Sequence, residues 1–244
     1  MASFLDKYID RVNASIMEDQ EPLSYLTSRG VTIEDIKKYR LGYSKLITPV
    51  DDGSADYTAM KKKTFDWMVL KGKIIYPISA CNGATIGLTA RRLDLPGKPV
   101  NDKIPKYKHV VTAEADKVGA FFGVSQAAPH IIEKGYVYVV EGGMDCISLA
   151  KVFPNTVSTL TSLVNKAQMW TLEMLAGQVI VVFDPDDAGR KGAARAESDY
   201  GTTRVKIREL GYADPNKCLV DMGLPAFTEF AKRKLHFVSF SRGL

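Results

Sequence analysis

Acidic residues follow two apolar runs in the second half of the chain. Residues 137–140 are apolar without alternation and lead into Glu141, and residues 179–183 lead in the same way into Asp184 and Asp186. Continuous β-branched runs are typical of strands that are buried on both faces. Because ligands of open α/β sheets bind beyond the carboxyl ends of the strands, these carboxylates lie where a site is expected.

The chemistry that these residues predict is the binding of a hard divalent cation. Side chains alternate along an extended segment, so Asp184 and Asp186 can point the same way, and Glu141 can join them from a neighbouring strand. Oxygen ligands without a nearby histidine or cysteine favour Mg²⁺ or Mn²⁺ over zinc. For either motif alone, an ordinary turn, with Asp187 helping to start a helix, stays open as an alternative.

Strands alternate with helices around the two acidic motifs. This order predicts a parallel sheet with right-handed crossovers. The helix between the motifs at 166–175 is expected to place Met169 and Trp170 in the core. The other elements expected here are helices over 146–152, 190–200 and 225–235 and strands over 156–160 and 203–207.

The first half of the chain predicts a different architecture. Residues 1–40 show helical spacing of apolar residues, and the polar segment 51–63 is expected to form a loop or hairpin. Strands over 73–78 and 85–93 flank Asn82-Gly83, which is a strong hairpin signal. We therefore expect an α+β lobe with an antiparallel sheet.

The acidic motifs also carry a family resemblance. Glu141-Gly-Gly-Met-Asp145 and Phe183-Asp-Pro-Asp-Asp-Ala-Gly189 resemble the TOPRIM domain of bacterial-type primases, topoisomerases and some nucleases, and the Ala-Gly-Arg-Lys that follows is most similar to DnaG-type primases. The resemblance implies that Glu141, Asp184 and Asp186 coordinate catalytic metals and that Asp145 is a further catalytic acidic position. Asp214, in Asp214-Pro-Asn-Lys217, resembles a late acidic motif and is either an accessory acidic group or the start of a helical turn.

Basic residues of the first half extend the resemblance. Lys73 lies in a strand similar to one of these primases, Arg91 lies in a glycine-containing strand, Lys106 lies in a proline-lysine-tyrosine motif, and Lys117 precedes Phe121-Phe-Gly123. The resemblance implies that they line a groove between two lobes and bind nucleoside triphosphates and template phosphates, with Lys106 also catalytic. For each residue alone, a solvated surface charge is the alternative.

The predicted organisation has three parts. An α+β N-terminal lobe over residues 1–128 is followed by an α/β TOPRIM domain with a parallel, Rossmann-like sheet over 129–213 and by a short helical tail over 214–244. The resemblance implies a DNA primase that synthesises short RNA primers on single-stranded DNA from ribonucleoside triphosphates by two-metal nucleotidyl transfer, with a replicative helicase as partner. A TOPRIM-type nuclease and a non-catalytic replisome nucleic-acid-binding module stay open.

Composition agrees with a polyanionic partner. The 244 residues carry a formal net charge of +5, with 45% hydrophobic and 25% charged residues, which are proportions of a soluble globular protein. The three cysteines lie far apart, so we expect neither a disulfide nor a zinc site. We find no apolar run of membrane-spanning length and no signal-peptide pattern, and we therefore expect a cytoplasmic protein of a bacterial or phage-infected cell.

Overall fold

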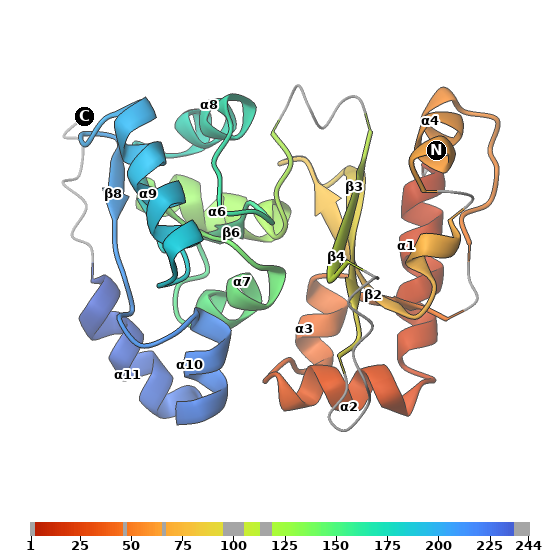
Figure 1. Ribbon diagram of the computed structural model, residues 1–244, viewed down its shortest axis with the longest axis horizontal. Coiled ribbons are helices and arrows are strands. Elements are labelled where there is room, and N and C mark those ends of the chain that lie inside the picture. Colours follow the sequence, from red (N-terminus) through yellow and green to blue (C-terminus); the bar gives the residue numbers. More distant parts are fainter. Residues whose placement is uncertain (1–2, 46–47, 65–66, 95–104, 113–118, 237–244) are drawn as a thin grey trace. The chain divides into compact units, whose positions relative to one another are not determined.

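The computed structural model describes residues 3–45, 48–64, 67–94, 105–112 and 119–236. The chain divides into two compact units, Met1–Ala120 and Phe121–Leu244 (Figure 1). The predicted boundary between residues 128 and 129 falls inside helix α6 (Val124–Lys134), which packs on strands of the second unit. The structure thus divides the chain eight residues earlier, because Phe122 already forms a β-bridge with Ser158.

The first unit contains an antiparallel sheet in the order β1-β2-β3-β4. Its strands are β1 (Gly42–Ser44), β2 (Lys73–Ser79), β3 (Thr85–Arg92) and β4 (Tyr107–Val111). Its helices are α1 (Phe4–Ile16), α2 (Gln20–Ser28), α3 (Ile33–Lys38), α4 (Ala55–Thr64) and the 3₁₀ helix η1 (Met68–Leu70). The expected hairpin at Asn82-Gly83 joins β2 to β3, which confirms the prediction of an antiparallel sheet.

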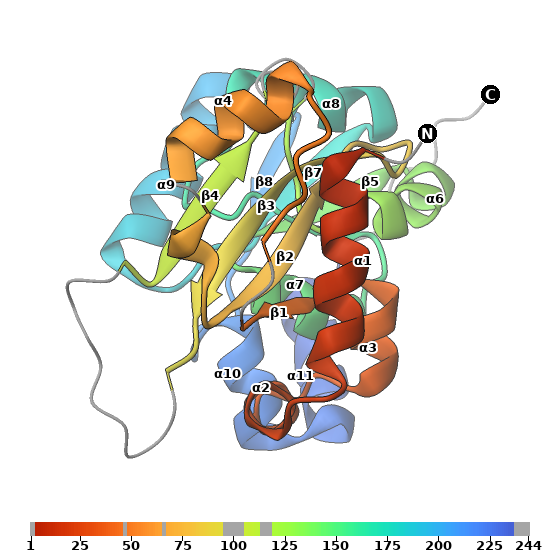
Figure 2. The same ribbon diagram turned by 90° about the vertical axis from the view of Figure 1, so that its right-hand side faces the viewer.

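Helices α1 and α4 cover one face of this sheet (Figure 2). Ser3 caps α1 by accepting a hydrogen bond from the backbone N of Asp6, and the apolar residues of α1 recur at helical spacing and are buried. The prediction of a loop or hairpin over 51–63 is wrong, because α4 occupies most of this segment. Its Tyr57 and Met60 are buried three residues apart on one side of the helix, a signal that the neighbouring lysines obscure in the sequence.

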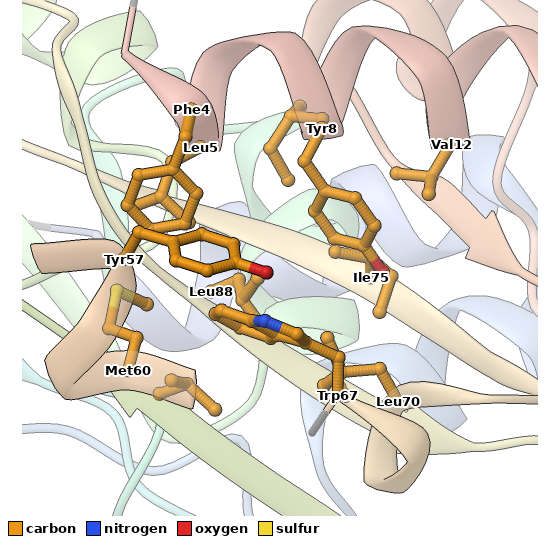
Figure 3. Packing of buried hydrophobic residues seen from close by; sticks show 13 residues of the cluster. Phe4, Leu5, Tyr8, Val12, Tyr57, Met60, Trp67, Leu70, Ile75 and Leu88 are labelled. Carbon is orange, nitrogen blue, oxygen red and sulfur yellow. The ribbon is translucent and has the colours of Figure 1, made fainter. Parts of the chain in front are cut away.

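An aromatic cluster forms the core beneath these helices (Figure 3). The rings of Phe4 and Tyr57 meet edge to face, with centroids 5.4 Å apart and planes at 84°. Trp67 lies 6.1 Å from Phe4 and 5.9 Å from Tyr57, centroid to centroid. Aromatic pairs of this geometry contribute beyond the area that they bury, so the cluster fastens α1 and α4 to the sheet.

Asp6 joins three elements of the first unit. Its Oδ1 accepts hydrogen bonds from Thr85 Oγ1 at 2.6 Å and from Arg40 Nη1 at 3.3 Å, while Ser3 Oγ donates to Oδ2 at 2.9 Å. Burial opposes ionisation of Asp6, but the hydrogen bonds from Thr85, Ser3 and Arg40 outweigh it and lower its pKa. The ionised carboxylate therefore ties α1 to β3 and to the end of α3.

The second unit contains a parallel sheet in the order β6-β5-β7-β8, which confirms the predicted α/β architecture. Its strands are β5 (Tyr136–Val140), β6 (Thr156–Ser158), β7 (Gln178–Val181) and β8 (Val205–Ile207). Besides α6, its helices are α7 (Gly143–Ala150), α8 (Lys166–Leu175), α9 (Asp187–Tyr200), α10 (Pro215–Met222) and α11 (Leu224–Leu235). Among the described residues, no helix is long and apolar enough to cross a membrane.

The expected C-terminal tail packs within the second unit. Tyr138 Oη, from the central strand β5, donates a hydrogen bond to the Leu235 carbonyl at 2.7 Å, and Phe227 and Ala231 of α11 are fully buried. Residues 237–244 lie outside the described residues. In α8 the prediction of two core residues holds for Met169 but is wrong for Trp170, which is 56% exposed. Met169 and Leu172 lie three residues apart on the buried side of the helix, and Trp170 lies outside that side.

We predict that Phe4→Ala destabilises the first unit by about 3–5 kcal/mol, since it removes a buried ring and leaves a cavity between α1 and α4. Urea denaturation followed by tryptophan fluorescence measures the change. Met68→Ala is the matched control, because Met68 is 60% exposed and its removal should change stability by less than about 0.5 kcal/mol. Equal stability of the Phe4 variant and the parent would contradict the packing role.

We also predict that Asp6→Asn lowers stability at neutral pH and that its effect disappears in acid. A lowered folded-state pKa means that the stabilisation is present above the unfolded value of 3.8 and is lost as the pH falls through the lower folded value. Denaturation midpoints measured from pH 7 to pH 3 should therefore converge for the two proteins. A difference that stays constant over this range would exclude the charge as its cause.

Candidate active site

The carboxyl ends of β5 and β7 lie side by side and bring the two acidic motifs together. In the parallel register Val139 pairs with Val181. Just beyond this pair, the backbone N of Asp184 donates a 3.0 Å hydrogen bond to Glu141 Oε1. The sequence pattern predicted this adjacency, and the hydrogen bond fixes the Glu141 side chain against the tip of the neighbouring strand.

Helix α9 begins directly at these carboxylates. Asp186 is its N-cap residue, and Asp186 Oδ1 accepts a 2.7 Å hydrogen bond from the backbone N of Gly189. A Cβ atom at position 189 would lie 2.2 Å from the Asp184 carbonyl oxygen and 2.6 Å from Glu141 Oε1. Only glycine lets the helix approach this closely, so the residues after the aspartates shape the site as much as the aspartates do.

Asp145 lies in the first turn of α7 and is buried. Burial raises its pKa to about 8, and the neighbouring charges of Asp214 and Asp184 add to this effect. Its Oδ1 accepts a 3.1 Å hydrogen bond from the backbone N of Asn216. A Cβ at position 142 would lie 2.3 Å from Asp145 Oδ2, which explains the glycine at the start of this helix.

The late motif ties α10 to α7. Asp214 caps α10, since its Oδ1 accepts a 2.6 Å hydrogen bond from the backbone N of Lys217. The fully buried Asn216 side chain donates from Nδ2 to Ser148 Oγ at 2.9 Å. Asp214 therefore starts a helix, as one of the two expectations for it stated, and its charge also acts on Asp145. Its role as an accessory acidic group of the site stays a prediction. Sequence reasoning missed this positioning role of Asn216, whose partners lie about 70 residues earlier in the chain.

The acidic side chains at the two strand tips are of the type that binds a hard cation. Glu141, Asp184 and Asp186 offer only oxygen ligands, as Mg²⁺ prefers. Within the described ranges no group of three acidic, histidine or cysteine side chains converges closely enough to hold an ion. Burial raises the pKa of Glu141, and the charges of Asp186 and Asp145 raise it further, so a cation at these strand tips would relieve the repulsion between carboxylates.

The predicted basic residues of the first unit divide between the two faces of its sheet. Arg91 pairs with Ile74, whereas Lys73 pairs with Arg92, one position along β3. Because successive side chains of a strand point to opposite faces, Lys73 and Arg91 lie on opposite sides. The pKa of Lys73 is lowered by burial and by the nearby charges of Arg92 and Lys108.

Arg91 is 5% exposed and lies among aromatic rings. Its guanidinium carbon is 5.6 Å from the Tyr25 ring centroid and 5.5 Å from that of Tyr107. Lys106 is exposed, and its Nζ lies 5.8 Å from the Tyr107 ring. Lys117 lies outside the described residues, and the groove between the lobes stays a prediction.

Comparisons with known proteins agree with this arrangement. The Toprim-like family matches residues 138–219, which include both acidic motifs. The DNA primase of Aquifex aeolicus is 29% identical over 237 residues, which cover 90% of this chain and 46% of that protein. The chain thus spans less than half of this relative's length.

Solved structures establish the fold. The DnaG catalytic core has a TM-score of 0.74 at 21% identity and covers 94% of this chain and 78% of its own. The DnaG primase catalytic domain bound to single-stranded DNA has a TM-score of 0.69, also at 21% identity, over 94% of this chain and 79% of its own.

The two sheets and the strand-tip carboxylates define a TOPRIM-containing protein with the architecture of a primase catalytic core. The chain is related to the DnaG-type DNA primases, as its sequence motifs predicted.

We predict that Gly189→Ala destabilises the second unit by about 1–3 kcal/mol, because the added methyl group collides with the Asp184 carbonyl and with Glu141. Thermal and urea denaturation measure the effect. Lys191→Ala is the control on the same helix, since Lys191 is exposed and the substitution should be nearly neutral. Unchanged stability of the Gly189 variant would mean that α9 can move away from the strand tips without cost.

Proposed function

We propose that this chain is the RNA polymerase core of a DNA primase, which synthesises short RNA primers on a single-stranded DNA template during replication. The observation that carries the proposal is the pairing of Glu141 with the backbone of Asp184 at adjacent strand tips of a Toprim-like domain. Similarity to DNA primases over most of the chain supports the same activity.

In this proposal Glu141, Asp184 and Asp186 hold Mg²⁺ or Mn²⁺. The bound ions would supply charge stabilisation for the attacking and leaving oxygens of nucleotidyl transfer. Asp186 also holds α9 in place through Gly189, so the same residue positions the helix and faces the reaction. Asp145 and Asn216 keep α7 and α10 together behind these ligands. The chain's own contribution is therefore a fixed set of carboxylates at one edge of the sheet.

Basic residues of the first unit are proposed to bind the anionic substrates. Lys106 is exposed and acts as a mobile point charge for phosphate, whereas Arg91 has a planar fork that can grip two phosphate oxygens. The stacking of Arg91 on Tyr25 and Tyr107 restricts its side chain before substrate arrives. For Lys73 and Lys117 we propose the same binding of phosphates, on the family resemblance alone.

The proposed partners are single-stranded DNA, ribonucleoside triphosphates and a replicative helicase. A DnaG primase catalytic domain of the same fold has been solved bound to single-stranded DNA. The formal net charge of +5 supports binding of a polyanion. The proposal of a helicase partner rests on the relationship to primases alone.

The test is primer synthesis by the purified chain with labelled ribonucleotides, single-stranded DNA of mixed sequence and Mg²⁺. We predict that Asp184→Asn and Glu141→Gln each lower product formation by about 100-fold or more, since each removes a charge from the reacting centre. Chelation of the metal should abolish product. Both variants should keep the far-ultraviolet circular dichroism of the parent.

Asp187→Asn is the matched control. Asp187 follows Asp186 directly in the sequence, but its side chain is 87% exposed and forms an ion pair with Arg190. Loss of this charge should leave the rate of primer synthesis within about 3-fold of the parent's, the scale of a surface ion pair. Degradation of the DNA without new RNA would favour a TOPRIM nuclease instead. Binding of DNA without any product would favour a non-catalytic nucleic-acid-binding module.

A further inference from the structure

Two aromatic rings lie parallel on strand β4 of the first unit. Tyr107 and His109 are two residues apart, so they share one face of the sheet. Their ring centroids are 6.3 Å apart and their planes differ by 8°. Tyr107 is half-buried and His109 is exposed, so the His109 ring is the member of the pair that solvent reaches more readily.

A residue on the neighbouring strand fixes the orientation of the His109 ring. Its Nδ1 forms a 2.9 Å hydrogen bond with Oγ1 of Thr89, a fully buried residue that is its direct neighbour on β3. Partial removal of the His109 ring from water, although the residue as a whole is exposed, and secondly the charge of Lys108 lower the pKa of His109, so the neutral imidazole is favoured. A ring that is already oriented loses little conformational entropy when it binds a ligand.

Cations surround this aromatic pair. The Arg91 guanidinium lies 5.5 Å and Lys106 Nζ lies 5.8 Å from the Tyr107 ring centroid, whereas Lys108, between the two rings in sequence, points to the opposite face of the sheet. In the part of the first unit that the structure describes, β4 is an outer strand of the sheet. Flat rings with cations along one strand match a polymer in which bases and phosphates alternate.

We propose that the His109 ring, backed by Tyr107, stacks an unpaired base of single-stranded nucleic acid while the exposed Lys106 contacts a phosphate of the same strand. This inference rests on the proposed function, from which it takes nucleic acid as the partner. It adds a stacking surface to the phosphate contacts. Stacking does not distinguish one base from another, so the surface holds the strand without selecting its sequence.

The test is fluorescence anisotropy of a labelled single-stranded oligonucleotide without Mg²⁺ or ribonucleotides. His109→Ala should weaken binding about 5-fold or more, the range that loss of one base stack produces. His109→Phe should bind within about 2-fold of the parent, because it keeps the ring and loses only the bond to Thr89. His130→Ala is the control for loss of a histidine elsewhere, on α6 of the other unit.

Two further measurements separate stacking from charge. An oligonucleotide of the same length with abasic positions should bind the parent more weakly, and His109→Ala should lose this difference. The slope of log affinity against log salt concentration should stay unchanged in His109→Ala but fall by about 0.7 in Lys106→Ala, the value for one phosphate contact on a single strand.

The outcomes distinguish this inference from the proposed function. Parent and His109→Ala proteins that bind equally, or a parent that does not discriminate abasic DNA, would overturn the stacking surface while leaving the primase proposal intact. Weaker ribonucleotide binding by His109→Ala with unchanged strand binding would assign the ring to the nucleotide and overturn the inference as stated. A parent that does not bind single-stranded DNA at all would overturn both.

Discussion

The hydrogen bond from the Asp184 backbone to Glu141 is the contact on which the site of the second unit depends. It joins the tips of two parallel strands that come from segments 43 residues apart. It can form only because the third residue of α9 is Gly189, where any side chain would strike both partners. The strand tips, the start of the helix and the position of the acidic side chains are therefore one structural feature.

The crowded carboxylates of the site lower the stability of the folded chain. Several carboxylates share one edge of the sheet, and two of them have raised pKa values because burial and mutual repulsion oppose ionisation. Networks of backbone hydrogen bonds to Glu141, Asp145 and Asp186 hold the groups in place against this repulsion. Crowding of this kind is typical of functional sites, where a cation or a proton compensates the charge.

The antiparallel sheet of the first unit assigns different roles to its two faces. One face carries the aromatic cluster of Phe4, Tyr57 and Trp67 and anchors α1 and α4. The other carries Arg91 between the rings of Tyr25 and Tyr107, with the exposed His109 beside them. Strand alternation thus gives the two faces of one short sheet different contents, an apolar core on one side and a buried arginine among aromatic rings on the other.

The sequence by itself determined the features that depend on neighbouring residues. Apolar runs gave the buried strands, Asn82-Gly83 gave the hairpin, and parallel order placed Glu141 beside Asp184, because the carboxyl ends of parallel strands meet at one edge. Only the tertiary structure decided the rest. The helix over 55–64, the exposure of Trp170 and the burial of Asn216 against α7 depend on which surface each segment meets. That choice is made by packing between residues far apart in the chain, and local spacing encodes it weakly, as for Tyr57 and Met60, or not at all.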